Sequence, residues 1–75
     1  MNYKMYIERN PEIMLGKPII KGTRITVELI MRKLAEGYNI DSILKSYPHL
    51  TKDQIYATLE YAADLIANEE ILESA

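Results

Sequence analysis

Apolar residues recur every three or four positions over three stretches of the chain, the spacing that gathers side chains on one face of a helix. They are Val27, Ile30, Met31 and Leu34 in the first stretch, Ile40, Ile43, Leu44 and Tyr47 in the second, and Ile55, Leu59, Ala62 and Ile66 in the third. This periodicity predicts helices over residues 26–36, 39–47 and 51–68, each with one buried face.

Capping residues stand at the start of all three predicted helices. Thr26, Asn39 and Thr51 each carry a side-chain oxygen that can accept a hydrogen bond from a backbone N–H of the first turn. Gln54 follows Thr51 by three residues and completes a capping box. The starts of the helices are therefore predicted by capping as well as by periodicity.

The ends of the helices carry different signals. Gly37 can take the left-handed conformation that commonly ends a helix, and Pro48 cannot continue one. The third helix has two alternative ends, because Asn68 can stop it whereas Ile71 and Leu72 can extend it.

The first 25 residues predict a β-arm or hairpin. Residues 3–8 alternate as in a short strand, and the β-branched pair Ile19 and Ile20 favours extended structure. Because a single strand needs a partner, residues 3–8 are expected to pair either with Ile19 and Ile20 or with the same strand of a second copy. Residues 21–23, Lys-Gly-Thr, predict a tight turn between the second strand and the first helix.

The order of these elements predicts a mostly helical fold. The short Pro-His-Leu segment between the second and third helices has the length of the turn in a helix-turn-helix, with the first helix bracing the pair. We therefore expect a three-helix helix-turn-helix core, of the homeodomain or winged-helix type, with a short N-terminal β-arm. A plain three-helix bundle without any relation to DNA would have the same pattern.

The length and composition of the chain limit its class. The 75 residues predict one domain, residues 1–75, whose small core favours dependence on a partner or a second copy. The sequence has no cysteine, which excludes disulfides, and it has no apolar run typical of a signal peptide or a membrane span. We expect a cytoplasmic protein without membrane contact.

Charge is distributed unevenly along the chain although the formal net charge is only −2. Residues 1–33 carry seven cations and three carboxylates, whereas residues 34–75 carry two cations and eight carboxylates. Such an asymmetry indicates two surfaces with different partners, a basic one for phosphate and an acidic one for a basic protein. The alternative is that both are solvated faces without a partner.

Several segments of the chain carry a family resemblance. Gly-Lys-Pro-Ile-Ile-Lys-Gly-Thr-Arg-Ile occupies residues 16–25, and the likeness continues through residues 34–38, 47–51, 55–56 and 59–63. The sequence resembles a family of small prokaryotic proteins with a G-K-P-x-I-x-G-T-R-I signature, long labelled a domain of unknown function and regarded as antitoxin-like. The resemblance implies a toxin protein as partner, often a PIN-type ribonuclease.

The basic half of the chain and the start of the third helix supply candidate DNA contacts, because cations bind phosphate and residues at the start of a recognition helix meet base edges. The candidates are Lys17, Lys21, Thr23, Arg24, Arg32, Lys33, Thr51, Lys52, Gln54 and Tyr56. The outward stripe of the third helix is expected to be Asp53, Ala57, Glu60 and Asp64. Its three carboxylates would repel phosphate, so the basic arm is expected to supply most of the attraction.

The end of the chain mixes carboxylates with apolar residues, as docking segments do. We expect Glu69, Glu70, Ile71 and Leu72 to contact a partner protein. The alternative is a solvated helix end, which is common at chain termini.

Enzymatic chemistry is not expected from this composition. The chain has one histidine, no cysteine and no glycine-rich phosphate loop, and we find no motif for a metal or a cofactor. The hypothesis is therefore an antitoxin component of a type II toxin–antitoxin system, forming a homodimer, that neutralises a PIN-type ribonuclease and can bind its own promoter DNA. The alternatives are a stand-alone helix-turn-helix regulator and a structural dimerisation module.

Overall fold

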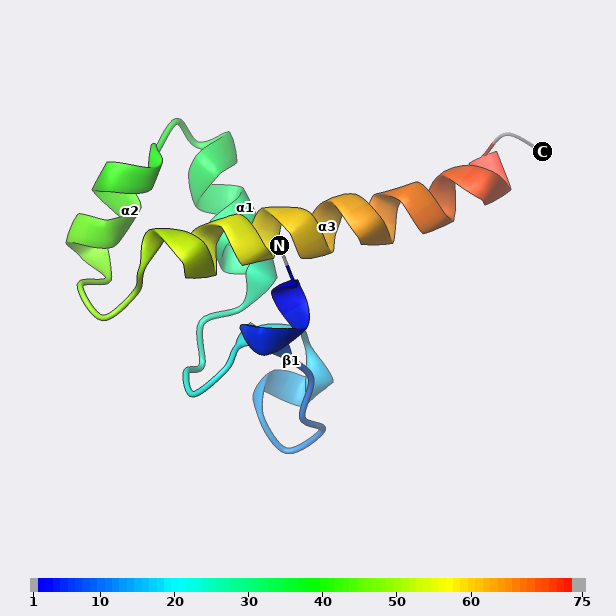
Figure 1. The fold of residues 1–75 in the computed structure, drawn as a ribbon, viewed down its shortest axis with the longest axis horizontal. Helices are drawn as coiled ribbons and strands as arrows, with labels where there is room; N and C mark the ends of the chain where they lie inside the picture. The colour runs from blue at the N-terminus through cyan, green and yellow to red at the C-terminus, as the bar shows by residue number, and fades with distance from the viewer. Residues whose placement is uncertain (1, 74–75) are drawn as a thin grey trace.

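Three helices follow a short two-stranded arm in the computed structural model, which describes residues 2–73, with side chains described as far as Asn68 (Figure 1). The elements are η1 (Tyr3–Met5), β1 (Ile7–Glu8), η2 (Met14–Gly16), β2 (Ile19–Ile20), α1 (Val27–Ala35), α2 (Ile40–Ser46) and α3 (Lys52–Glu73), where η denotes a 3-10 helix. The mostly helical fold with three helices and an N-terminal arm is confirmed.

The arm differs in its first half from the predicted strand over residues 3–8. Residues 3–5 form the 3-10 helix η1, because the Asn2 side chain accepts a hydrogen bond from the Lys4 N–H at 3.1 Å and caps it. Within residues 3–8, β1 alone forms a strand, and it pairs antiparallel with β2 so that Ile7 faces Ile20. Pairing with the Ile19–Ile20 segment is therefore the alternative that the structure adopts.

The turn predicted at residues 21–23 is confirmed. Gly22 has φ +77°, a backbone conformation that residues other than glycine rarely adopt. The Thr23 hydroxyl donates to the Ile20 carbonyl at 2.8 Å and accepts from the Ile25 N–H at 3.0 Å. The turn is thus closed by its own side chain, which fixes the direction in which the chain enters α1.

The caps of α1 and α2 form as predicted. The Thr26 hydroxyl accepts from the Leu29 N–H at 3.0 Å, and Asn39 accepts from the Ser42 N–H at 2.8 Å. The Ser42 hydroxyl in turn accepts a hydrogen bond from the Asn39 N–H at 2.9 Å, which completes a capping box. The sequence analysis missed it because Ser is not the usual residue three positions after the cap.

The two ends of α3 differ in how well they were predicted. The Thr51 N–H donates to Gln54 Oε1 at 2.8 Å, and the Gln54 N–H donates to the Thr51 hydroxyl at 3.3 Å, which confirms the capping box. The helix does not end at residue 68 but continues to Glu73. Its second half projects beyond α1, α2 and the arm (Figure 1).

The core lies where β2 and the three helices meet. Its fully buried large side chains are Ile19, Ile20, Ile30, Ile43, Ile55 and Thr58. Thr58 is satisfied by donating its hydroxyl proton to the Ile55 carbonyl at 2.7 Å. Five isoleucines therefore carry most of the apolar burial, and each of the three helices and β2 contributes at least one.

The buried face of α3 differs from the predicted one at two positions. Ala57 was expected to face outward and is fully buried, whereas Ile66 was expected to be buried and is 61% exposed. The reason is that η1 and β1 pack against α3 in addition to α1 and α2, which widens the buried face in its first half. The second half of α3, to which Ile66 belongs, projects from the body (Figure 1).

Replacing Ile30 by alanine tests the position of the core. Ile30 is fully buried, so Ile30→Ala is expected to lower the free energy of unfolding by about 2–5 kcal/mol in urea titrations. Met5 is 65% exposed, and Met5→Ala is expected to change it by less than about 0.5 kcal/mol. Equal effects of the two substitutions would contradict the core described above.

Candidate functional site

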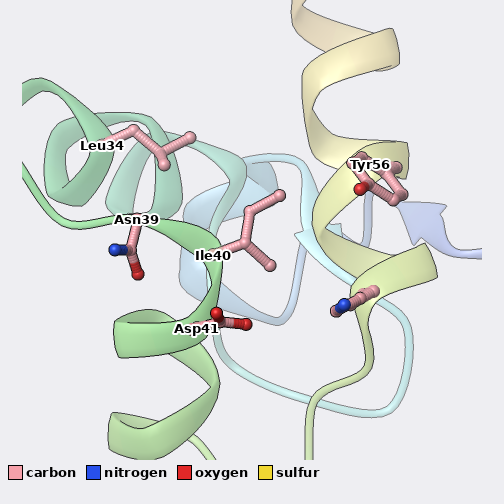
Figure 2. A pocket seen from close by; sticks show the side chains of 6 residues that line it. Leu34, Asn39, Ile40, Asp41 and Tyr56 are labelled. Carbon is pink, nitrogen blue, oxygen red and sulfur yellow. The ribbon is translucent and has the colours of Figure 1, made fainter.

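An open pocket of about 460 Å³ lies between the start of α2 and the start of α3. It is lined by Leu34, Asn39, Ile40, Asp41, Lys52 and Tyr56 (Figure 2). Lys52 and Tyr56 are one helical turn apart on α3, and Tyr56 is 45% exposed. The start of α3 thus presents an ammonium group and an aromatic ring on a surface that a ligand can reach.

The charges of this pocket limit what it can bind alone. Asp41 in the first turn of α2 contributes a carboxylate to the same pocket as the Lys52 ammonium group. The two opposite charges leave the pocket without a net attraction for phosphate. A nucleic acid at this place therefore requires further cations from neighbouring segments.

The turn between β2 and α1 supplies such cations. Lys21 and Arg24 are both exposed, and neither forms an ion pair with any residue between 2 and 68. In Figure 1 this turn lies toward the same end of the long axis as the start of α3, opposite the projecting half of α3. The arm and the start of α3 can therefore contribute to one basic end.

Two other predicted cations are engaged with a carboxylate. Glu28 Oε1 lies 3.1 Å from Lys17 Nζ, and its Oε2 lies 3.1 Å from Arg32 Nε. The hydrogen bond from Lys17, followed by that from Arg32, holds the pKa of the Glu28 carboxyl below its usual range. Lys17 and Arg32 are exposed, but half of their combined charge is balanced by Glu28.

The remaining residues predicted to bind DNA are engaged with other groups of the described part of the chain. Lys33 Nζ lies 4.8 Å from the centroid of the Tyr38 ring, a cation–π contact. The Thr23 hydroxyl closes the turn before α1, and Thr51 and Gln54 form the capping box of α3. The structure therefore brings Lys52 and Tyr56 together in one pocket and places Lys21 and Arg24 in one turn. Thr23, Thr51 and Gln54 form hydrogen bonds that close this turn or cap α3.

The predicted partner segment lies outside the described side chains. Glu69, Glu70, Ile71 and Leu72 belong to α3, which the structure describes as helical to Glu73, but their side chains are not part of the described residues. Of the predicted outward stripe, Asp53, Glu60 and Asp64 are exposed. The described part of α3 after Lys52 therefore carries carboxylates and no cation.

One cluster that joins the arm to α3 was missed by the sequence analysis. Arg9 donates to the Tyr61 hydroxyl from Nη2 at 2.8 Å and from Nε at 3.0 Å, and the Tyr3 and Tyr61 rings meet edge to face at 5.5 Å. Partial burial, followed by the neighbouring Asp64 carboxylate, raises the pKa of Tyr3. No local signal marks a contact between residues 52 positions apart, so pattern analysis could not find it.

Among the side chains of residues 2–68, no three histidine or acidic groups come together in a way that could hold a metal ion. None of the helices within residues 2–73 combines the length and the apolar character that crossing a membrane requires.

Comparisons with known proteins place this fold in a group without an assigned function. Residues 7–62 match the family model described as "Protein of unknown function (DUF433)". The uncharacterized protein y4eO of Sinorhizobium fredii is 29% identical over 56 residues, which are 75% of this chain but 25% of that protein. The chain thus spans about a quarter of the length of this curated relative.

A solved structure extends the likeness to three dimensions. The crystal structure of a DUF433 member protein from Anabaena variabilis superposes with a TM-score of 0.78 over 92% of this chain and 68% of that one, at 23% sequence identity. At this identity the likeness shows that the fold is shared.

The ion pairs of Glu28 predict a pH dependence. Because the pKa of Glu28 is lower in the folded than in the unfolded chain, its contacts stabilise the fold above the unfolded-state pKa, and this contribution is lost as the pH falls through the folded-state pKa. Glu28→Gln is therefore expected to be less stable than the unmodified protein at pH 7, and the difference is expected to vanish in acid.

Urea titrations over a pH series measure this difference, and NMR titration of the Glu28 carboxyl carbon measures its pKa, which Lys17→Met is expected to raise. Glu36→Gln is the matched control, because Glu36 is exposed and forms no ion pair within residues 2–68. A Glu28→Gln profile that runs parallel to the unmodified protein at every pH would refute the interpretation.

Proposed function

The chain belongs to the DUF433 family of proteins of unknown function, and on that premise we propose that it is the antitoxin component of a type II toxin–antitoxin system, acting in the cytoplasm. In this proposal it neutralises a PIN-type ribonuclease and binds the DNA of its own promoter. The proposal combines the signature at residues 16–25 with the charge and the exposure of the side chains described above.

The observation that carries the proposal is an uneven distribution of charge along the molecule, with the exposed cations Lys21 and Arg24 in the arm and exposed carboxylates along α3. The turn between β2 and α1 and the start of α3 lie toward one end of the long axis, and α3 extends to the other end (Figure 1). Lys21, Arg24 and Lys52 in these two segments are exposed, and α3 has no lysine or arginine after Lys52. A cationic end attracts phosphate, and an anionic helix attracts a basic protein surface. An antitoxin that also represses its promoter uses both kinds of contact.

The DNA contact is proposed for the arm and the first turns of α3. Lys21 and Arg24 would bind backbone phosphates, and Lys52 and Tyr56 would reach the bases from the start of α3. Because Glu60 and Asp64 are exposed further along α3, the helix would meet the groove by its start and not along its length. This division gives the arm most of the electrostatic attraction.

The toxin contact is proposed for the second half of α3. A ribonuclease must attract the phosphates of RNA and therefore has a basic surface. The acidic end of α3, which includes Glu69 and Glu70, would cover that surface and exclude RNA, while Ile71 and Leu72 would supply apolar contacts.

Reversing two charges in the arm tests the DNA contact. Lys21→Glu with Arg24→Glu is expected to lower the affinity for a duplex from the region upstream of its own gene by at least about tenfold. It is also expected to reduce the slope of log K against log salt by about 0.9 for each phosphate that the variant no longer neutralises. Fluorescence anisotropy over a salt series measures both, and circular dichroism checks that the helices are retained.

The control for this variant has the same change in net charge. Lys4→Glu with Lys45→Glu alters two exposed lysines outside the proposed contact and is expected to leave most of the affinity intact. Equal losses in the two double variants would show that only total charge matters. Unchanged binding by the Lys21 and Arg24 variant would mean that the arm is not the DNA-binding surface.

Removing the residues after Ala67 tests the toxin contact. The shortened chain, coexpressed with the product of the adjacent gene, is expected to lose copurification with it, whereas its DNA affinity is expected to fall by a smaller factor. Glu36→Gln with Asp41→Asn, which removes acidic charge outside α3, serves as a control and should keep the complex.

The possible results separate the proposal from its two rivals. Loss of DNA binding with retention of the complex would contradict the assignment of the two ends. Tight DNA binding without any complex would favour a stand-alone regulator, and the absence of both would favour a structural dimerisation module.

A further inference from the structure

An apolar groove runs between the start of α1 and the second half of α3. We name it the α1–α3 groove; it has a volume of about 340 Å³ and is lined by Pro18, Val27, Glu28, Met31, Tyr61, Ala62, Leu65 and Ile66. Glu28 is the one charged residue of this lining, and it is already paired with Lys17 and Arg32. We propose that a second copy of this chain occupies the groove, making the protein a two-fold homodimer.

The apolar side chains beside the groove have no cover within the described part of the chain. Leu65 is 44% exposed and Ile66 is 61% exposed, and both belong to the second half of α3, which projects from the body (Figure 1). A helix that projects with aliphatic side chains exposed gains free energy when another surface removes them from water. The groove and the side chains that can fill it belong to the same chain, which is the condition for a self-complementary contact.

Charge complementarity favours a second copy and fixes the orientation. On the α1 side of the groove, Lys17 and Arg32 share the single carboxylate of Glu28, which leaves an excess of one positive charge. The α3 helix has no cation after Lys52. Parallel packing of two α3 helices would align their carboxylates, whereas antiparallel packing separates the two acidic ends and leaves the positive α1 side of each groove facing the α3 helix of the other copy, on which Glu60 and Asp64 are exposed.

The resulting dimer has a defined arrangement. The two α3 helices cross near Leu65 and Ile66, and each places these side chains against Val27 and Met31 of the other copy. One such dimer carries two turns with Lys21 and Arg24, one for each of two DNA half-sites. The dimer serves the proposed function but is tested without DNA or toxin, so that failure of either idea is seen separately.

Placing a charge in the apolar contact tests the interface. Sedimentation equilibrium of the purified chain is expected to show a dimer, and Ile66→Glu is expected to raise its dissociation constant by at least about tenfold. Met5→Glu is the matched control, because Met5 is exposed to a similar degree, 65%, and is not among the residues that line the groove. Circular dichroism of both variants checks that the fold is retained.

Cross-linking provides a second measurement in a chain that has no cysteine of its own. A mixture of Met31→Cys and Ile66→Cys chains, treated with a short bismaleimide, is expected to give the mixed dimer in high yield. A mixture of Met31→Cys and Met5→Cys chains is expected to give little. Both positions chosen for the proposed contact are at least partly exposed, so the substitutions do not open the core.

The outcomes decide the matter in either direction. A monomer at all concentrations, or a dimer that Ile66→Glu leaves unchanged, would overturn the proposal. A monomer that forms a complex with the adjacent gene product, which Ile66→Glu then disrupts, would assign the groove to that partner instead of a second copy and would equally overturn it.

Discussion

The burial of two consecutive isoleucines in β2 is the constraint on which the rest of the structure depends. Ile19 and Ile20 are both fully buried, and because consecutive strand residues point to opposite faces, both faces of this segment are covered. The Val27 N–H donates to the Pro18 carbonyl at 2.9 Å, and Thr26 forms a bridge with Ile19, so the chain returns along β2 before α1 begins. The turn between them must therefore extend into solvent. Its two cations, Lys21 and Arg24, are exposed for that reason.

The same constraint explains why some of the predicted DNA-binding side chains are free to contact a ligand whereas others are engaged within the chain. A cation on the turn has only solvent and its neighbours around it, whereas Lys17, one residue before Pro18, is held near α1 and reaches Glu28. Residues that close the turn or cap α3 have their hydrogen-bonding groups engaged locally. The exposed arm and the start of α3 are therefore the part of the predicted set that keeps groups available for a ligand.

What could be predicted from the sequence follows from the range of each interaction. Thr26, Asn39 and Thr51 each accept a hydrogen bond from a backbone N–H three residues away, so they located the helix starts to within a residue. The face of α3 depends on η1, β1 and α1, which are distant in the sequence, and the helical period alone misplaced Ala57 and Ile66. For the candidate site, the sequence was sufficient to predict which charged residues are candidates. The ion pair between Lys17 and Glu28 could not be predicted, because it depends on how the arm packs against α1.

The length of α3 links the two ends of the molecule. At about 1.5 Å per residue, its 22 residues span about 33 Å, most of the 42 Å length of the molecule. Leu65 and Ile66 in the second half of this helix are exposed among the described residues, so these two side chains contact either water or another surface. Water is the unfavourable alternative for aliphatic side chains. The long helix that keeps the acidic end distant from the basic arm therefore also creates the need for an intermolecular contact.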